Sequence, residues 1–180
     1  MSEASVSDLL VDNLAISVRR ATPEDAPAIA ALVNTAYAVE QAFVDGDRTT
    51  VEEVAELTRR GVFLVLEHGT GIAAAIYLER RDVHAYFGML AVDPALQGMG
   101  LGTRLVRIAE ALAEATGAGA MTLRIVNLRE ELARWYKALG YQETGTSPYV
   151  DRPVKRACHF VDMAKRLGDV PAVTAFAALG

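Results

Sequence analysis

The chain has 180 residues, of which 52% are hydrophobic and 23% are charged. This length predicts a single domain, and the composition is typical of a globular protein. The 23 acidic and 18 basic side chains give a net charge of −5. That balance argues against non-specific nucleic-acid binding, which requires a basic surface.

Residues with special chemistry are few. Cys158 is the only cysteine, so no disulfide can form within the chain, and the three histidines are not spaced as metal ligands. The first residues are acidic rather than basic, which is not typical of a signal peptide, and no apolar run reaches membrane-spanning length. We therefore expect a cytoplasmic protein with no metal site and no membrane segment.

The first half of the chain predicts one strand, two helices and three further strands. Residues 16–19 alternate between apolar and polar types, as in a strand. Thr22 and the proline after it predict the start of a helix that ends near Tyr37. Thr50 and Glu53 form the capping-box pattern of a second helix. The three strands cover residues 62–67, 72–78 and 83–92.

The second half predicts alternating helices and strands. Leu101, Leu105, Ile108 and Leu112 repeat at helical spacing, and Gly117 ends that helix. The later elements are a strand over residues 121–126, a helix over 132–139, and strands over 141–144 and 156–163.

The predicted order of elements is β-α-α-β-β-β-α-β-α-β-β, which places the chain in the α+β class. Residues 1–167 are expected to form the one domain. Residues 168–180 form an apolar C-terminal tail, which is expected to dock on a surface or on a partner chain.

A glycine-rich segment joins the strand that ends at Asp93 to the helix that follows. Gly98, Gly100 and Gly102 lack the Cβ atoms that would keep a ligand away from the backbone. The first amides of a helix have no partner within it, and the helix dipole adds positive potential. The segment therefore predicts an anion site that suits a pyrophosphate.

Two common nucleotide-binding motifs can be excluded by their spacing. The dinucleotide fingerprint G-x-G-x-x-G requires a third glycine at position 103 or 105, but these positions hold Thr103 and Leu105. The P-loop requires a Gly-Lys pair, and the chain has none. A dinucleotide-dependent oxidoreductase is therefore not expected.

The segment Gln97-Gly98-Met99-Gly100-Leu101-Gly102 resembles the Gln/Arg-x-x-Gly-x-Gly/Ala signature of the GNAT superfamily of N-acetyltransferases. Residues 132–141, with Tyr136 shortly before a Gly-Tyr pair, resemble the second motif of that family. The resemblance covers about residues 16–167 and implies a GNAT-like fold. In that fold a mixed, mostly antiparallel sheet is flanked by helices.

The resemblance implies acetyl-CoA, or another acyl-CoA, as the co-substrate. Backbone groups before the glycine turn would bind the acyl carbonyl and pantetheine, amides of the turn would bind the pyrophosphate, and Asn127 would contact pantetheine. The implied cofactor-binding residues are Leu90, Ala91, Val92, Gln97, Gly98, Met99, Gly100, Leu101, Gly102, Thr103, Arg104 and Asn127.

Tyr136 matches the family tyrosine that acts as a general acid and protonates the departing thiolate. A general base is harder to assign, because the position of the glutamate in histone-modifying members holds Tyr86. Glu79 and His84 are the two candidates for the base, and deprotonation of the amine through ordered water is the alternative.

The implied function is transfer of an acetyl group to a primary amine of a small molecule or peptide, by direct attack in a ternary complex. Phe43, Arg48 and Tyr149 are candidate acceptor contacts, the last of them in a predicted loop over residues 145–149. The absence of a carboxylate at Tyr86 leaves one alternative open, a non-catalytic acyl-CoA sensor or interaction domain. A homodimer formed through the late strands or the tail is also expected as one arrangement.

Overall fold

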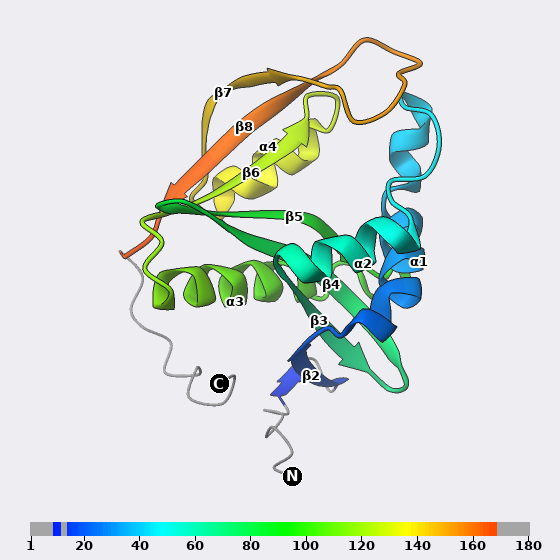
Figure 1. Ribbon diagram of the computed structural model, residues 1–180, viewed down its shortest axis with the longest axis vertical. Helices are drawn as coiled ribbons and strands as arrows, with labels where there is room; N and C mark the ends of the chain where they lie inside the picture. Colours follow the sequence, from blue (N-terminus) through cyan, green and yellow to red (C-terminus); the bar gives the residue numbers. More distant parts are fainter. Residues whose placement is uncertain (1–8, 12–13, 169–180) are drawn as a thin grey trace.

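The computed structural model describes residues 9–11 and 14–168, which form a single twisted sheet with helices against both faces (Figure 1). The strands are β1 (Leu9–Val11), β2 (Leu14–Arg20), β3 (Val62–His68), β4 (Gly71–Arg81), β5 (His84–Val92), β6 (Ala120–Val126), β7 (Gln142–Pro148) and β8 (His159–Arg166). The helices are η1 (Pro23–Asp25), α1 (Ala26–Ala36), η2 (Ala38–Ala42), α2 (Val51–Arg60), η3 (Pro94–Leu96), α3 (Leu101–Ala115) and α4 (Glu130–Ala138).

The sheet has eight strands in the order β1-β2-β3-β4-β5-β6-β8-β7. Neighbouring strands are antiparallel except β5 and β6, which run parallel. The predicted α+β class, with a mixed and mostly antiparallel sheet, is confirmed. The predicted order of elements holds from β2 onwards, and the short β1 was not predicted.

Two predictions near the C-terminus are wrong. The strand predicted over residues 141–144 continues to Pro148, so most of the predicted 145–149 loop is strand β7. Its residues are mostly exposed and polar, and pairing with β8 rather than an apolar pattern makes them a strand. Cys158 lies just before β8 rather than within it. The predicted apolar tail lies outside the described residues, apart from Gly168.

Two hydrophobic clusters hold the helices against the sheet. One joins α3 and Tyr136 of α4 to one face of the central strands. The other joins α1 and α2 to the opposite face of β3, β4 and β5. Strand β4 carries the unbroken buried run 73–79, because helices cover it on both faces.

Strands β5 and β6 diverge after a short contact, as Figure 1 shows. They pair only at Ala85–Met121 and Tyr86–Thr122, whereas β6 pairs with β8 along its whole length. Strand β5 also contains a bulge, because its register with β4 shifts between Ala75 and Tyr77. Met89 lies within this bulge at φ 50°. The bulge and the divergence open the sheet beside the glycine turn.

Candidate active site

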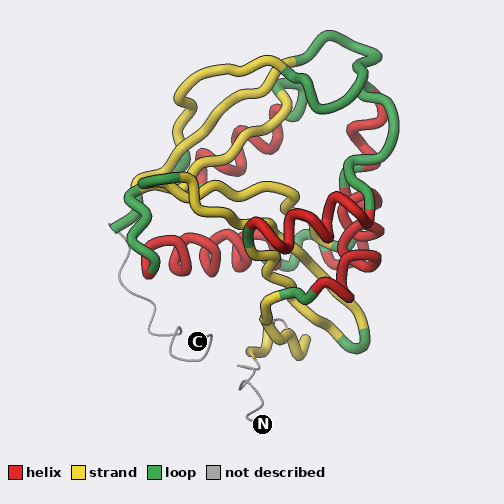
Figure 2. The backbone as a smooth tube through the Cα atoms, in the orientation of Figure 1, coloured by secondary structure: helices red, strands yellow, loops and turns green. Residues whose placement is uncertain are grey.

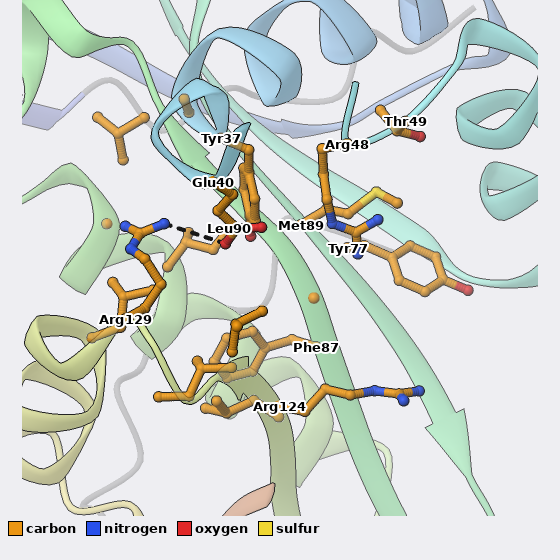
Figure 3. Close-up of a pocket in the computed structure, with 18 of the residues that line it drawn as sticks. Tyr37, Glu40, Arg48, Thr49, Tyr77, Phe87, Met89, Leu90, Arg124 and Arg129 are labelled. Atoms are coloured by element: carbon orange, nitrogen blue, oxygen red, sulfur yellow. Dashed lines mark hydrogen bonds and ion pairs between the residues drawn. The ribbon is translucent and has the colours of Figure 1, made fainter. Parts of the chain in front are cut away.

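A cavity of about 1050 Å³ lies where β5 and β6 diverge. At one end it is lined by the C-terminal part of β5, the glycine turn and the start of α3. At the other end it is lined by α1, η2, the segment before α2, and residues that follow β7. Figure 3 shows the side chains of this second end converging over β5. One cavity thus connects the predicted phosphate site to a group of polar and aromatic side chains.

The glycine turn places free amide groups at the start of α3. Gly98 and Gly100 adopt left-handed backbone angles, with φ values of 82° and 78°. The first helical hydrogen bond of α3 runs from the Arg104 amide to the Gly100 carbonyl, at 3.0 Å. The amides of residues 101–103 therefore precede the internal bonding of the helix, and they are available to an anion.

The three glycines of the turn differ in their backbone angles and surroundings. A Cβ at Gly98 or Gly100 would meet no atom within 4 Å, so these glycines are needed for their left-handed backbone. A Cβ at Gly102 would lie 3.6 Å from both Trp135 and Val92. These are ordinary van der Waals distances, so the packing of α3 against β5 and α4 leaves room for an alanine at this position.

Most of the predicted cofactor-binding residues meet at this end of the cavity. The lining includes Leu90, Val92, Gln97, Gly98, Gly100, Leu101, Gly102 and Thr103. Ala91 is buried against the opposite face of the sheet, as the alternation of a strand requires, so only its backbone could take part. Met99 and Arg104 are not among the residues that line the cavity.

Arg104 provides a test of whether a phosphate fits. Its Nη2 atom is buried and has no hydrogen-bond partner in the described part of the chain. Burial also lowers the pKa of its guanidinium. A buried donor without a partner is unfavourable unless a ligand satisfies it, and a phosphate oxygen would do so. The free amides of residues 101–103 belong to residues that line the cavity, with Arg104 directly behind them in sequence, so the residues present fit a pyrophosphate.

Tyr136 lies in the wall of the cavity, on α4. Its side chain is 5% exposed and packs against the rings of Phe87, Trp135 and Tyr141. Its hydroxyl forms no hydrogen bond with the residues that the structure describes. Burial raises the pKa of Tyr136 well above its usual value, and burial also raises the pKa of nearby Tyr37 to about 12. Both phenols are therefore protonated at neutral pH and can act as donors.

Glu79 lines the cavity, but its carboxylate is already bound. The Tyr77 hydroxyl donates to it at 2.6 Å, Arg81 pairs with it, and Arg60 lies 3.8 Å away. Burial raises its pKa, but the hydrogen bonds from Tyr77 and Arg81 outweigh burial, and the net pKa is lowered. Glu79 is therefore ionised at neutral pH.

The other candidate base, His84, is the exposed first residue of β5 and does not line the cavity. Tyr86, which replaces the glutamate of histone-modifying members, does line it. The Tyr86 ring lies along the strand, since a Cβ at Gly88 would come within 2.8 Å of its hydroxyl oxygen. The Arg81 guanidinium stacks on the same ring, 3.8 Å from its centre.

The structure adds Glu40, a carboxylate that the sequence did not indicate. It is 4% exposed, and it pairs with Arg129 at 3.3 Å and with Arg152 at 3.4 Å (Figure 3 shows the first pair). Burial raises the pKa of Glu40, although the nearby arginines oppose that effect. Glu40 contributes to the raised pKa of Tyr37, so it belongs to the same polar group.

Asn127 lies away from these residues. Its Oδ1 accepts a hydrogen bond from the His159 backbone amide at 2.9 Å, and the backbone amide of Asn127 donates to the His159 carbonyl. These bonds connect the end of β6 to the start of β8. Asn127 does not line the large cavity.

The predicted acceptor contacts are only partly brought together. Arg48 and Tyr149 line the cavity. Phe43 packs instead into a small cluster with Val44, Val126 and Phe160.

Among the described residues no group of three histidine, cysteine or acidic side chains could hold a metal ion. No helix in the described ranges is long and apolar enough to cross a bilayer.

Comparisons with known proteins agree with this geometry. Residues 59–143 match the family described as the acetyltransferase (GNAT) domain. These residues run from the end of α2 to the start of β7, so they include β5, the glycine turn and Tyr136. No curated protein sequence matches the chain.

Several solved structures share the fold. Ard1 from Thermoplasma volcanium is 19% identical, with a TM-score of 0.71 over 86% of this chain and 99% of that one. The putative acetyltransferase yncA from Salmonella typhimurium, solved with its cofactor acetyl-CoA, is 22% identical, with a TM-score of 0.69 over 89% of this chain and 98% of that one. The ribosomal-protein-S18-alanine N-acetyltransferase from Escherichia coli is 20% identical, with a TM-score of 0.65 over 89% and 99%.

The fold and the matched domain define the class of protein as an acetyltransferase. The matched residues carry a GNAT acetyltransferase domain, the family that the two sequence motifs resemble.

Proposed function

We propose that the protein transfers an acetyl group from acetyl-CoA to the primary amine of a small molecule, by direct attack within a ternary complex. The observation that carries this proposal is the single cavity that extends from the free amides of α3 to Tyr136. The two ends of the cavity can hold the two substrates next to each other. Such positioning removes much of the entropic cost of a bimolecular reaction.

Residues of the glycine turn would hold the co-substrate. The amides of residues 101–103 and the Arg104 guanidinium would bind its pyrophosphate. Acetyl-CoA supplies the acetyl group as a thioester. Backbone groups at the β5 bulge, around Leu90, would bind the acyl carbonyl, because a bulge leaves backbone groups without a partner in the sheet.

Tyr136 is the proposed general acid. It stays protonated, it lies in the cavity wall, and its hydroxyl is free to donate to the departing sulfur. For the general base we favour Glu40 over Glu79, because a raised pKa brings a carboxylate closer to the strength that proton transfer from an ammonium group requires. Glu79 remains the alternative base.

Binding and turnover can be measured separately. Acetyl-CoA at roughly 100 times its Kd should raise the melting temperature by about 5–10 °C. A panel of primary amines should then release free CoA thiol. If acetyl-CoA causes no shift, the proposed function is wrong. If it causes a shift but no amine releases thiol, the alternative of a non-catalytic acyl-CoA sensor is supported.

Gly100→Ala should weaken the binding of acetyl-CoA. An alanine at φ 78° is strained by about 1–2 kcal/mol, and relief of that strain would turn the free amides away from the pyrophosphate. We expect a lower melting temperature and an acetyl-CoA Kd raised about 10-fold, measured by calorimetry. Gly71→Ala is the matched control, because Gly71 has no left-handed backbone and open space around its Cβ position. Equal Kd values for the two variants would contradict this role.

A further inference from the structure

The second end of the cavity contains an arginine without a partner. Arg48 lines the cavity, and its guanidinium forms no ion pair or hydrogen bond with any described residue. Figure 3 shows the side chain extending into the cavity beside Tyr37. Burial lowers the pKa of Arg48, whereas Tyr37, Asp151 and Glu53 raise it, and the net pKa is raised. The group is therefore a permanent cation.

The backbone next to Arg48 is firmly held. The Thr49 amide donates to Asn34 Oδ1 at 2.9 Å, and Asn34 Nδ2 donates to the Thr49 carbonyl at 3.0 Å. The Thr49 hydroxyl also donates to Glu53 at 2.8 Å. These bonds attach the segment to both α1 and α2. The Arg48 guanidinium lies over the Tyr37 ring, 5.7 Å from its centre. Arg48 is thus held in position while its guanidinium has no ion pair or hydrogen bond among the described residues.

Other arginines in the cavity are already engaged. Arg60 and Arg81 pair with Glu79, and Arg129 and Arg152 pair with Glu40. Arg124 has no acidic partner within the described ranges, but its guanidinium is stacked on Phe160, 4.9 Å from the ring centre. Arg48 is therefore the cation best placed to receive an anionic group from a ligand.

Two segments that contribute residues to this end of the cavity are joined to each other beside it. Val44 and Val154 form an antiparallel bridge, so the segment after η2 meets the β7–β8 loop (Figure 2). The Asp45 amide donates to the Pro153 carbonyl at 2.9 Å, and the Arg152 guanidinium donates to the Gly46 carbonyl at 3.1 Å. These contacts hold Arg152, which lines the cavity, in place beside Glu40.

We propose that Arg48 binds the carboxylate of the acceptor, and that the acceptor is an amino-acid-like molecule whose amine receives the acetyl group. A guanidinium holds a carboxylate through two parallel hydrogen bonds, which fixes its orientation. Binding the carboxylate at Arg48 leaves the amine free to point along the cavity towards β5. This inference rests on the proposed function, because it describes the second substrate of that reaction.

The experiment measures acceptor binding without turnover. The protein is saturated with free coenzyme A and titrated calorimetrically with L-amino acids, their carboxamides, and the matching amines that lack the carboxyl group. At least one amino acid should bind about 10- to 100-fold more tightly than its carboxamide. Arg48→Met should remove this difference and leave the Kd of acetyl-CoA unchanged.

Two further variants test whether the preference for a carboxylate depends on Arg48 alone. Arg59→Met is the matched control, since Arg59 is exposed on α2 and pairs with Glu56, and it should keep the full preference for the carboxylate. Arg124→Met should also keep it. The inference is overturned if no amino acid binds more tightly than its carboxamide, or if Arg124→Met rather than Arg48→Met removes the preference. If Arg48→Met does not fold, the comparison of amino acids with their carboxamides on the wild-type protein still tests whether the acceptor site binds a carboxylate.

A failure of this inference can be distinguished from a failure of the proposed function. If acetyl-CoA binds and amines are acetylated without preference for a carboxylate, only the role of Arg48 is wrong. If acetyl-CoA produces no thermal shift, the proposed function itself is wrong.

Discussion

Tyr136→Phe should lower kcat by about 10²- to 10⁴-fold and leave the affinity for acetyl-CoA nearly unchanged. The substitution removes only the hydroxyl, and the ring keeps its contacts with Phe87, Trp135 and Tyr141. That hydroxyl forms no hydrogen bond with any described residue, so its loss leaves no donor or acceptor of the protein without a partner. The expected loss is therefore one of catalysis rather than of folding.

The physical reason is the charge that develops on the leaving sulfur. A thiolate released into a partly buried cavity is poorly solvated, and a phenol that donates a proton to it stabilises the transition state. Because burial raises the pKa of Tyr136, the phenol remains a donor throughout the pH range in which amines react. The measurement is CoA release under saturating acetyl-CoA, together with calorimetric binding of acetyl-CoA.

Tyr141→Phe is the matched control for this prediction. Tyr141 is also buried, and its hydroxyl donates to Glu110 at 2.7 Å, away from the cavity lining. Its loss should destabilise the protein by about 1–3 kcal/mol, because Glu110 loses a partner, but kcat should hardly change. If Tyr136→Phe remains as active as the wild type, or if both variants lose the same fraction of kcat, Tyr136 is not the general acid.

The sequence predicted the parts of the site that depend on local chemistry. The three glycines predict the turn, Asp93-Pro94 predicts the end of the strand before it, and the helical spacing of apolar residues predicts the helix after it. Tyr136 was predicted from a second motif of the same kind. The left-handed angles of Gly98 and Gly100 fit that expectation.

The sequence could not predict what depends on contacts between distant segments. Glu40 lies in a segment with no apolar periodicity, and its partners Arg129 and Arg152 are 89 and 112 residues away in the chain. Strand β7 is mostly exposed, so no apolar pattern marked its length. The divergence of β5 and β6 likewise arises from pairing and from the bulge at Met89, neither of which leaves a local signal.

Glu40→Gln should lower kcat by about 10²- to 10⁴-fold if Glu40 is the general base, and Glu79→Gln should then have a much smaller effect. Glutamine keeps the shape of the side chain and an oxygen that can accept from Arg129 or Arg152. It cannot accept a proton from the amine. The measurement is CoA release by both variants, with folding checked by circular dichroism. The opposite ranking of the two variants would assign the base to Glu79.

The dependence of kcat on pH provides a second test of whether Glu40 or Glu79 is the general base. Burial raises the pKa of Glu40 above its ordinary 4.5, against the opposing charges of Arg129, Arg48 and Arg152, so activity should already decline above pH 4.5 as the pH falls. The net pKa of Glu79 is lowered, so the midpoint of a decline due to that group would lie below pH 4.5.

Folding stability should depend on Glu40 in the opposite direction to activity. The folded state holds the Glu40 proton more tightly than the unfolded chain does, because the folded pKa is raised. Its contribution to stability is therefore complete below pH 4.5 and is lost as the pH rises through the folded pKa. As the pH rises, ionised Glu40 would increase the activity of the enzyme while the folded state loses stability. Such opposite trends would indicate that Glu40 is buried for function rather than for stability. Denaturant titrations of wild type and Glu40→Gln across that window should show the decline in the wild type alone, and an equal decline in both would assign it to another group.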